Sequence, residues 1–343
     1  MLIAAATVII LWGLNQAQSV VVLLLVAMFL AVLATVPVRW MENKGIPSAL
    51  AVALVMAFLV AILLVTGGLV GASISSFYDA LPGYRTRMHD MVLSLKHLTA
   101  RHGVVITDAM LLRFVNPGGV LDLTASLFSS LGSVLSNVFL ILFTVLFILL
   151  ERTSFPVKIR LILDQPHAVF PLVTRFVGEM KRYMVIKTAI NLVAGVLTTV
   201  WLVILGVDFP VLWGFLAFLF HFVPNVGSII AAVPAMLLAL IQYGPGSAAL
   251  TAGGYIVIGT IIGNVIEPRI MGRRLGLSTL VVFVSLVFWG NLLGVVGALL
   301  CVPLTMTVKL ACESRADTRW IALLLGTEVN QESDPPPSPG VPT

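Results

Sequence analysis

Charged residues are scarce in this 343-residue chain, and their scarcity decides its class. Asp, Glu, Lys and Arg make up 10% of the sequence and hydrophobic residues 59%, whereas a soluble domain carries about 25% charged residues. Repeated apolar runs approach the roughly 20 residues that cross a bilayer. The net charge of +5 fits basic cytoplasmic loops better than a nucleic-acid-binding surface. We therefore predict an all-α polytopic membrane protein with no nucleic-acid partner.

Cysteines and catalytic motifs are also nearly absent. Cys301 and Cys312 are the only cysteines, and a straight helix would separate them by about 16 Å, which is too far for a disulfide. The sequence has no C-x-x-C or H-E-x-x-H metal spacing, no Gly-rich phosphate loop and no Ser/His/Asp constellation. We therefore expect no cofactor, no metal and no enzyme activity.

Eight apolar segments follow one another along the chain, and the charges between them suggest an orientation. They cover residues 1–14, 19–38, 48–72, 127–150, 184–206, 211–242, 247–266 and 279–311. The loop with Arg39 and Lys44 and the basic region 151–187 are predicted to be cytoplasmic, because Lys and Arg concentrate on that side. Region 73–126 has nearly balanced charges and is predicted to be external.

This orientation divides the chain into five parts. Within the external part, Met88, Met91, Val92, Leu95 and Leu98 recur at helical spacing and predict an amphipathic helix. We expect N-terminal transmembrane helices over 1–72, an external helical region over 73–126, a transmembrane helix and cytoplasmic linker over 127–183, a transport core over 184–312, and a cytoplasmic helix with a disordered tail over 313–343.

The two longest apolar runs, 211–242 and 279–311, are each broken near the middle by polar, small and proline residues. The loop charges place both ends of the first run outside and both ends of the second inside. Each run is therefore predicted to be a re-entrant helical hairpin, the first turning at 223–227 and the second at 289–294. The alternative is that each run forms one long, kinked or steeply tilted helix. The expected fold has about five to six full transmembrane helices plus these two inverted hairpins.

Two asparagines lie at the predicted hairpin tips, Asn225 and Asn291. A side-chain amide both donates and accepts hydrogen bonds without the cost of a buried charge, so it suits a hydroxyl-rich solute or a small cation. The alternative is that each amide only caps its own turn. The residues predicted to line the substrate pathway are Pro224, Asn225, Gly227, Asn264, Glu267, Asn291 and Gly294.

Three titratable residues are candidates for proton or cation coupling: His221, Asp208 and Glu267. Glu267 could instead pair with Arg269 or cap a basic loop, and a lone His is more often a packing residue. Cation–proton exchange needs titratable groups in the pathway. Because only His221 lies inside the core segments in this interpretation, the sequence favours a small polar solute or passive facilitation over antiport.

Several motifs in the transport core resemble one transporter family. They are Phe222–Gly227, Asn264–Gly272, Gly276–Ser278 and Gly294–Ala298 followed by Val302-Pro303. They resemble the autoinducer-2 exporter family, also called the PerM permease family, over nearly the whole chain and most specifically over 209–310. Family members usually begin with a charged leader and a full first helix, and this sequence has a shorter N-terminus. The resemblance implies a multi-pass protein of the bacterial inner membrane.

Members of that family are linked to export of the furanone signal autoinducer-2, and others to sodium(lithium)/proton antiport. We therefore expect a transporter that exports a small, autoinducer-2-like polar solute through a site formed by the two hairpins. The alternatives are a sodium(lithium)/proton antiporter and a non-transporting membrane scaffold. The expected partners are a small polar solute or monovalent cation, membrane lipid, and further copies of the chain in a homo-oligomer.

Overall fold

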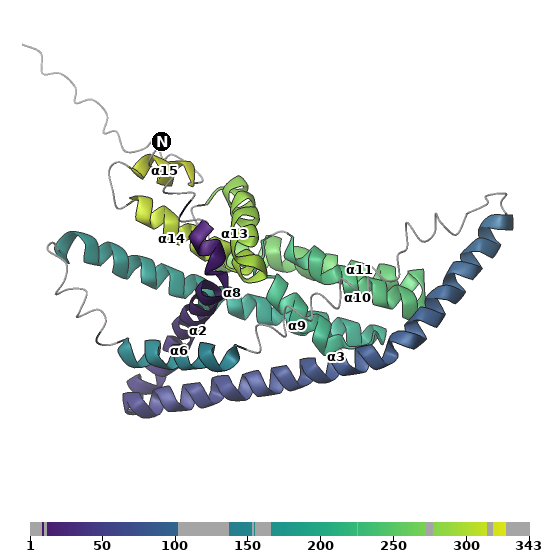
Figure 1. Cartoon of the computed structure of the whole chain (residues 1–343), viewed down its shortest axis with the longest axis horizontal. Coiled ribbons are helices and arrows are strands. Elements are labelled where there is room, and N and C mark those ends of the chain that lie inside the picture. The colour runs from purple at the N-terminus through teal and green to yellow at the C-terminus, as the bar shows by residue number, and fades with distance from the viewer. Residues whose placement is uncertain are drawn as a thin grey trace, which may run out of the picture.

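The computed structural model describes residues 9, 12–101, 137–152, 154, 166–224, 226–271, 277–313 and 318–326. These residues form helices and no strand (Figure 1). The elements are α2 (Gln18–Asn43), α3 (Ser48–Arg101), α6 (Val138–Glu151), α8 (Pro166–Leu205), α9 (Pro210–Phe220), α10 (Gly227–Tyr243), α11 (Pro245–Thr260), the π-helical turn η1 (Ile261–Ile266), α12 (Glu267–Met271), α13 (Thr279–Leu299), α14 (Cys301–Glu313) and α15 (Arg319–Leu324).

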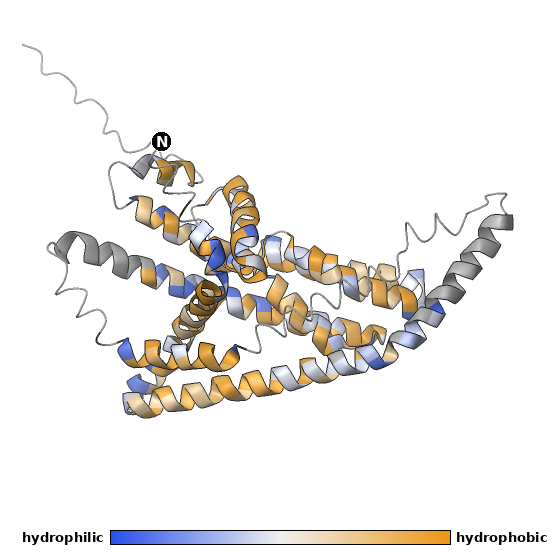
Figure 2. Ribbon diagram, in the orientation of Figure 1, coloured by the Kyte–Doolittle hydropathy of each residue, from blue (hydrophilic) through white to orange (hydrophobic). Residues whose placement is uncertain are grey.

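In the described part of the chain, five helices are long and apolar enough to cross a membrane. They are Gln18–Asn43, Ser48–Ala80, Val177–Leu205, Pro245–Ile270 and Leu280–Leu299. Apolar residues cover most of their length (Figure 2). This confirms the prediction of an all-α polytopic protein. The helices α6, α9 and α10 are apolar but shorter.

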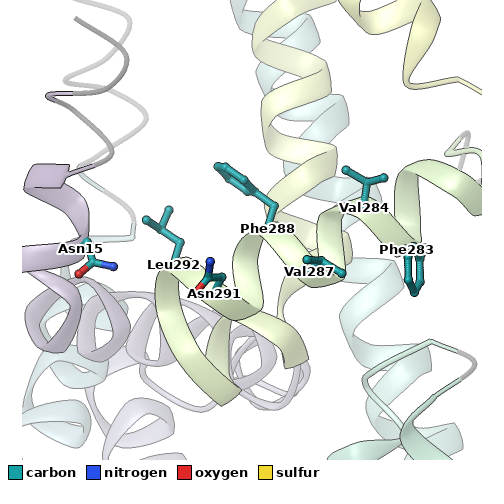
Figure 3. Close-up of a pocket in the computed structure, with 7 residues that line it drawn as sticks. All are labelled: Asn15, Phe283, Val284, Val287, Phe288, Asn291 and Leu292. Atoms are coloured by element: carbon teal, nitrogen blue, oxygen red, sulfur yellow. The ribbon is translucent and has the colours of Figure 1, made fainter. Parts of the chain in front are cut away.

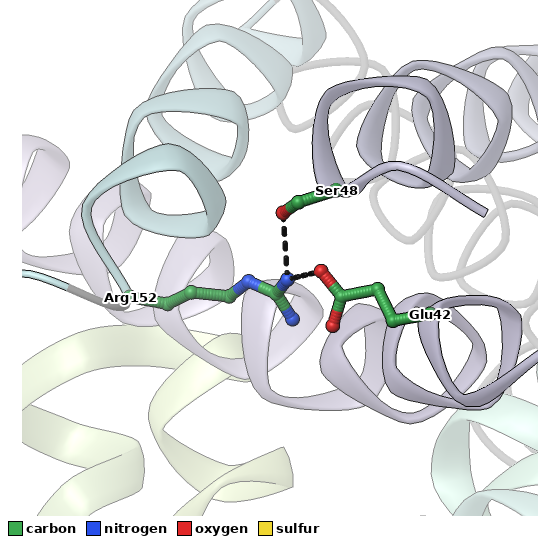
Figure 4. Close-up of polar contacts among 3 residues, drawn as sticks. All are labelled: Glu42, Ser48 and Arg152. Atoms are coloured by element: carbon green, nitrogen blue, oxygen red, sulfur yellow. Dashed lines mark hydrogen bonds and ion pairs between the residues drawn. The ribbon is translucent and has the colours of Figure 1, made fainter. Parts of the chain in front are cut away.

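The first three elements, α2, α3 and α6, pack into one unit around a shared apolar cluster. Ala27, Ala31 and Ala34 of α2 are buried at helical spacing, and such small side chains allow close helix approach. A polar contact closes one end of the unit (Figure 4). Arg152, which follows α6, forms an ion pair with Glu42 of α2, and its Nη2 donates to Ser48 Oγ at 3.1 Å. We call α2, α3 and α6 the scaffold unit.

Helix α3 runs without interruption from Ser48 to Arg101 along one edge of the molecule (Figure 1). The predicted boundary between residues 72 and 73 therefore falls inside a continuous helix. Residues 102–136 lie outside the described part, and the external position of 73–126 stays a prediction. The tail from residue 327 also lies outside the described residues.

The chain reverses direction between α9 and α10, in the first broken run. The two ends of this segment are joined by hydrogen bonds: Tyr243 Oη donates to the Gly206 carbonyl at 2.9 Å, and the Asp208 N–H donates to Gln242 Oε1 at 3.2 Å. A Cβ on Gly227 would lie 1.8 Å from the Phe220 carbonyl oxygen, so only glycine permits this reversal. We call α9 and α10 hairpin 1.

A second reversal occurs at Gly294, inside the range assigned to α13. Gly294 has φ 66° and ψ −151°, a conformation that favours glycine. A Cβ on Gly290 would lie 3.6 Å from the Ala298 Cβ, although a continuous helix separates residues eight apart by about 12 Å. Trp289 Nε1 then donates to Thr305 Oγ1 of α14 at 3.0 Å. The candidate span Leu280–Leu299 is therefore not one straight helix, and we call α13 and α14 hairpin 2.

Helix α8 passes through the middle of the molecule and contacts hairpin 1, α11, α12 and α2 (Figure 1). Its contact with α9 is close because two glycines face each other. A Cβ on Gly214 would lie 1.8 Å from Thr199 Oγ1 and 2.7 Å from the Gly195 carbonyl oxygen. Hairpin 1 is thus packed directly against the α8 backbone.

Candidate functional site

A buried ion pair lies between α8 and α12. Lys187 Nζ is 2.6 Å from Glu267 Oε1, and Lys187 is only 2% exposed. The Glu267 side chain is 23% exposed. Charged side chains within membrane helices are rare and mark substrate or ion pathways by default. The sequence counted Lys187 among the charges of the basic region 151–187, although it also falls within the predicted core 184–312, and the structure buries it among the core helices.

The local sequence explains why Glu267 faces α8. Pro268 has no N–H, and its ring excludes the ordinary helical position of the carbonyl four residues earlier, which is that of Asn264. The chain accommodates this proline with the π-helical turn η1 immediately before Glu267. Such π-helical turns occur frequently at functional sites. Asn264 itself is exposed within this turn.

Asn191 connects the ion pair to hairpin 1. It lies one turn after Lys187 on α8 and is completely buried. In the orientation that satisfies both ends of its amide, it donates to the Lys187 carbonyl at 3.2 Å and accepts from the Phe222 N–H at 3.1 Å. The Phe222 N–H belongs to the hairpin 1 reversal, so α8 holds that reversal directly.

His221 lies in the same reversal and is 9% exposed. Its Nδ1 is 3.0 Å from the Ala217 carbonyl oxygen. Because a carbonyl only accepts, Nδ1 carries the hydrogen and Nε2 is left as the second ring nitrogen. The ring lies within electrostatic range of both Lys187 and Glu267. His221 therefore has a hydrogen-bond partner within hairpin 1, the Ala217 carbonyl.

Hairpin 2 contacts α8 on the turn before Lys187. Tyr183 and Met184 of α8 share one buried cluster with Cys301 and Val302 of hairpin 2. Asn191, on the turn after Lys187, holds hairpin 1. Lys187 consequently lies on α8 between the attachment points of the two hairpins, and we call this place the hairpin junction.

The other predicted residues are distributed over separate places. Pro224 and Gly227 lie in the hairpin 1 reversal, and Gly294 forms the hairpin 2 reversal. Asn225 lies outside the described residues. Asn291 is exposed and borders a cavity beside the helical residues 12–16, which we call the N-terminal helix (Figure 3). Of the predicted coupling residues, Glu267 belongs to the junction, and His221 lies in the hairpin 1 reversal within electrostatic range of it.

Asp208 belongs to a different polar group at the base of hairpin 1. Tyr84 Oη of α3 donates to Asp208 Oδ2 at 2.7 Å, and Gln242 Nε2 donates to Tyr84 Oη at 3.3 Å. Burial, followed by the hydrogen bond to the Asp208 carboxylate, raises the pKa of Tyr84 above its ordinary value. We call Tyr84, Asp208 and Gln242 the hairpin latch, because they join the scaffold unit to both ends of hairpin 1.

Sequence reasoning missed Lys187 and Asn191. Both follow the last charged residues of the basic linker, so Lys187 was counted with that linker. A signal was present, because Lys187, Asn191 and Thr198 recur at i, i+4 and i+11 in an otherwise apolar segment, and all three are buried. The argument that titratable groups are scarce in the core must therefore be corrected, since Lys187 and Glu267 form a titratable pair there.

Comparison with known proteins agrees with this architecture. The profile of the family described as AI-2E family transporter matches residues 1–316. The AI-2 transport protein TqsA of Escherichia coli (strain K12) is 37% identical over 325 residues, which cover 95% of this chain and 94% of the relative. Protein YhhT of the same strain is 33% identical over 322 residues, covering 94% of this chain and 92% of the relative. These matches describe a multi-pass inner-membrane transporter of a small solute and not an enzyme, and the chain belongs to the AI-2E transporter family.

Proposed function

We propose that the chain exports a small polar solute of the autoinducer-2 type across the bacterial inner membrane. In this proposal the hairpins are re-entrant and the solute passes the hairpin junction. Family membership supports transport, and the name of the relative TqsA supports the choice of solute. A segment whose two ends lie together, as those of hairpin 1 do, is expected to enter the bilayer and return to the same face.

The observation that carries the proposal is the position of Lys187. Consecutive turns of α8 hold hairpin 2 through Tyr183 and Met184, and hairpin 1 through Asn191. Irregular backbone at membrane depth is tolerated only where protein or a watery cavity satisfies its polar groups. Asn191 gives one backbone group of this reversal, the Phe222 N–H, a second acceptor beside the Leu219 carbonyl. The irregular backbone of the hairpin 1 reversal and the polar side chains of Lys187 and Asn191 therefore both support a polar site at the hairpin junction.

The ion pair suggests how a polar solute would be accommodated. With Lys187 bound to Glu267, neither charge is left without a partner in the interior. Hydroxyl groups of a solute can accept from the Lys187 ammonium and donate to the Glu267 carboxylate, and so replace part of that pairing. The site would then alternate between an ion pair and a solute-bound pair without exposing an uncompensated charge.

The test is reconstitution of the purified chain in proteoliposomes. Lys187→Met alone leaves Glu267 without its partner, which destabilises the fold as well as the site. The decisive variant is therefore Lys187→Met/Glu267→Met, which removes both charges. We expect this double variant to fold and to lose at least about tenfold of the autoinducer-2 flux, because apolar replacement of a buried pair is tolerated in folding. The control is Glu313→Gln, which removes an exposed i,i+4 pair with Lys309.

Wild-type flux in the folded double variant would contradict the role of the junction. Because Lys187 and Glu267 are titratable groups in the core, sodium-driven proton movement must be assayed in parallel. Proton movement that requires Glu267, without autoinducer-2 flux, would overturn the proposal in favour of an antiporter. A wild-type protein that moves neither would favour the scaffold.

A further inference from the structure

A cavity of about 500 Å³ lies between the N-terminal helix and hairpin 2, away from the ion pair (Figure 3). Its apolar wall includes Phe283, Val287 and Phe288 of α13, and its polar groups are the amides of Asn15 and Asn291. Small-molecule sites commonly have volumes of about 300–1,000 Å³, with apolar walls and a few placed polar groups. We call this cavity the amide groove.

A third amide approaches from the start of α2. The Nε2 atom of Gln18 is 3.1 Å from the point that a Cβ on Gly294 would occupy. Gly294, whose φ is +66°, ends the arm of hairpin 2 that carries Asn291. Two elements far apart in the sequence therefore bring three carboxamides to the region where hairpin 2 reverses.

These three amides have unused hydrogen-bonding capacity. Among the residues that the structure describes, no side-chain hydrogen bond of Asn15, Gln18 or Asn291 is formed with the protein. Each amide offers an acceptor oxygen and an NH₂ donor. A polar occupant can therefore use donors and acceptors that the protein itself leaves available.

The lining selects against charge. It contains amides, two phenylalanines and aliphatic side chains, and it has no Asp, Glu, Lys or Arg. An ion would therefore lose its hydration without gaining a counter-charge. A compact neutral solute can direct its hydroxyls to the amides and lay its apolar face on Phe283 and Phe288.

We propose that the amide groove binds a neutral, hydroxylated solute through Asn15, Gln18 and Asn291. This inference rests on the proposed function, because it identifies the class of transported solute as uncharged. It also adds Asn15 and Gln18, which lie just before and at the start of α2, to the substrate contacts. The groove recognises the solute, and the hairpin junction lies on its route.

The test measures equilibrium binding of two probes to the purified full-length chain in detergent. D-ribose serves as the neutral hydroxylated probe and D-ribonate as its charged counterpart. We expect saturable ribose binding that is weaker by about tenfold or more in Asn291→Leu and in Gln18→Met, which is the loss of one or two hydrogen bonds. The matched control is Gln16→Met, an exposed amide on the same N-terminal segment that does not line the groove.

Equal ribose affinity in the groove variants and in Gln16→Met would overturn the inference, as would tighter binding of ribonate. Efficient disulfide formation between copies carrying Val287→Cys, unaffected by ribose, would also overturn it, because a second copy would then cover the groove. Failure of the transport proposal can be distinguished from failure of the groove proposal. Groove-dependent binding without flux in proteoliposomes would refute transport alone, whereas wild-type flux with unaltered binding in the groove variants would refute the groove alone.

Discussion

At the scale of single residues, glycine decides where the two apolar runs reverse. Gly227 and Gly297 each face a backbone carbonyl of the preceding arm: a Cβ would lie 1.8 Å from the oxygen of Phe220 at Gly227, and 2.0 Å from the oxygen of Trp289 at Gly297. Each glycine is followed in the second arm by a proline, Pro234 or Pro303. The two hairpins thus use the same local solution although they lie far apart in the sequence.

The first prediction concerns Gly227. Gly227→Ala should destabilise the protein by about 1–3 kcal/mol, because the added methyl group meets a backbone oxygen that cannot move independently. Thermal unfolding in detergent measures this change. Gly246→Ala is the control, since a Cβ there has no neighbour within 4 Å. Equal melting temperatures for the two variants would contradict the close approach.

At the scale of elements, α8 is the helix that organises the core. Its turns before and after Lys187 contact hairpin 2 and hairpin 1 respectively, and Gly195 lets α9 approach its backbone. The sequence predicted an ordinary transmembrane helix here. Helix α8 also holds the two hairpins, because its buried face carries polar residues that pair with other elements.

The second prediction concerns Asn191. Asn191→Leu keeps the volume similar but removes the side-chain acceptor of the Phe222 N–H, which retains the Leu219 carbonyl, and it should cost about 0.5–1.5 kcal/mol. Hydrogen exchange at Phe222 should become faster, as measured by mass spectrometry. Thr198→Val is the control on the same helix, since the buried Thr198 hydroxyl has no partner in the described structure. Unchanged exchange in Asn191→Leu would show that the amide does not hold the reversal.

At the scale of the whole molecule, the scaffold unit and the core meet at a few contacts. The hairpin latch is one of them, because Tyr84 of α3 contacts Asp208 and Gln242 at the two ends of hairpin 1. Asp208 was predicted as a possible coupling residue. In the structure, the Asp208 carboxylate accepts from Tyr84 in the latch. The Asp208 backbone carbonyl accepts from Trp213 Nε1 at 2.9 Å.

The third prediction follows from the raised pKa of Tyr84. The fold stabilises the neutral phenol, so this stabilisation is complete below the ordinary tyrosine pKa of about 10 and is lost as the pH rises above it. Tyr84→Phe should lower the stability at neutral pH by about 1 kcal/mol, the net value of a hydrogen bond. Tyr84→Phe should also lose less stability than the wild type between about pH 9 and 12. Thermal unfolding at each pH measures this difference.

Tyr78→Phe is the control for this titration. Tyr78 lies nearby on α3, but its side chain is 49% exposed. An alkaline profile of Tyr84→Phe that matches the wild type would mean that the latch does not contribute to the pH dependence.

Much of the architecture could be predicted from local properties of the sequence. Apolar length determines which segments can form membrane helices, and the interruptions at Pro224 to Gly227 and at Gly290 to Gly294 mark both reversals because the effects of Pro and Gly on the backbone are local. The site was predicted less completely. Glu267 was identified as a candidate, with Arg269 as one possible partner, whereas the predicted proximity of Asn291 to Asn225 stays a prediction because Asn225 lies outside the described residues.

The membrane class, the helical composition and the positions of the two breaks follow from the amino-acid sequence alone, since each depends on residues close together in the chain. The pairing of Glu267 with Lys187, eighty residues away, and the position of Asn291 near Asn15 at one cavity follow from the packing of the helices. Such contacts depend on how helices rotate and pack against one another, and hydrophobic periodicity specifies that rotation poorly when a helix is apolar on all sides.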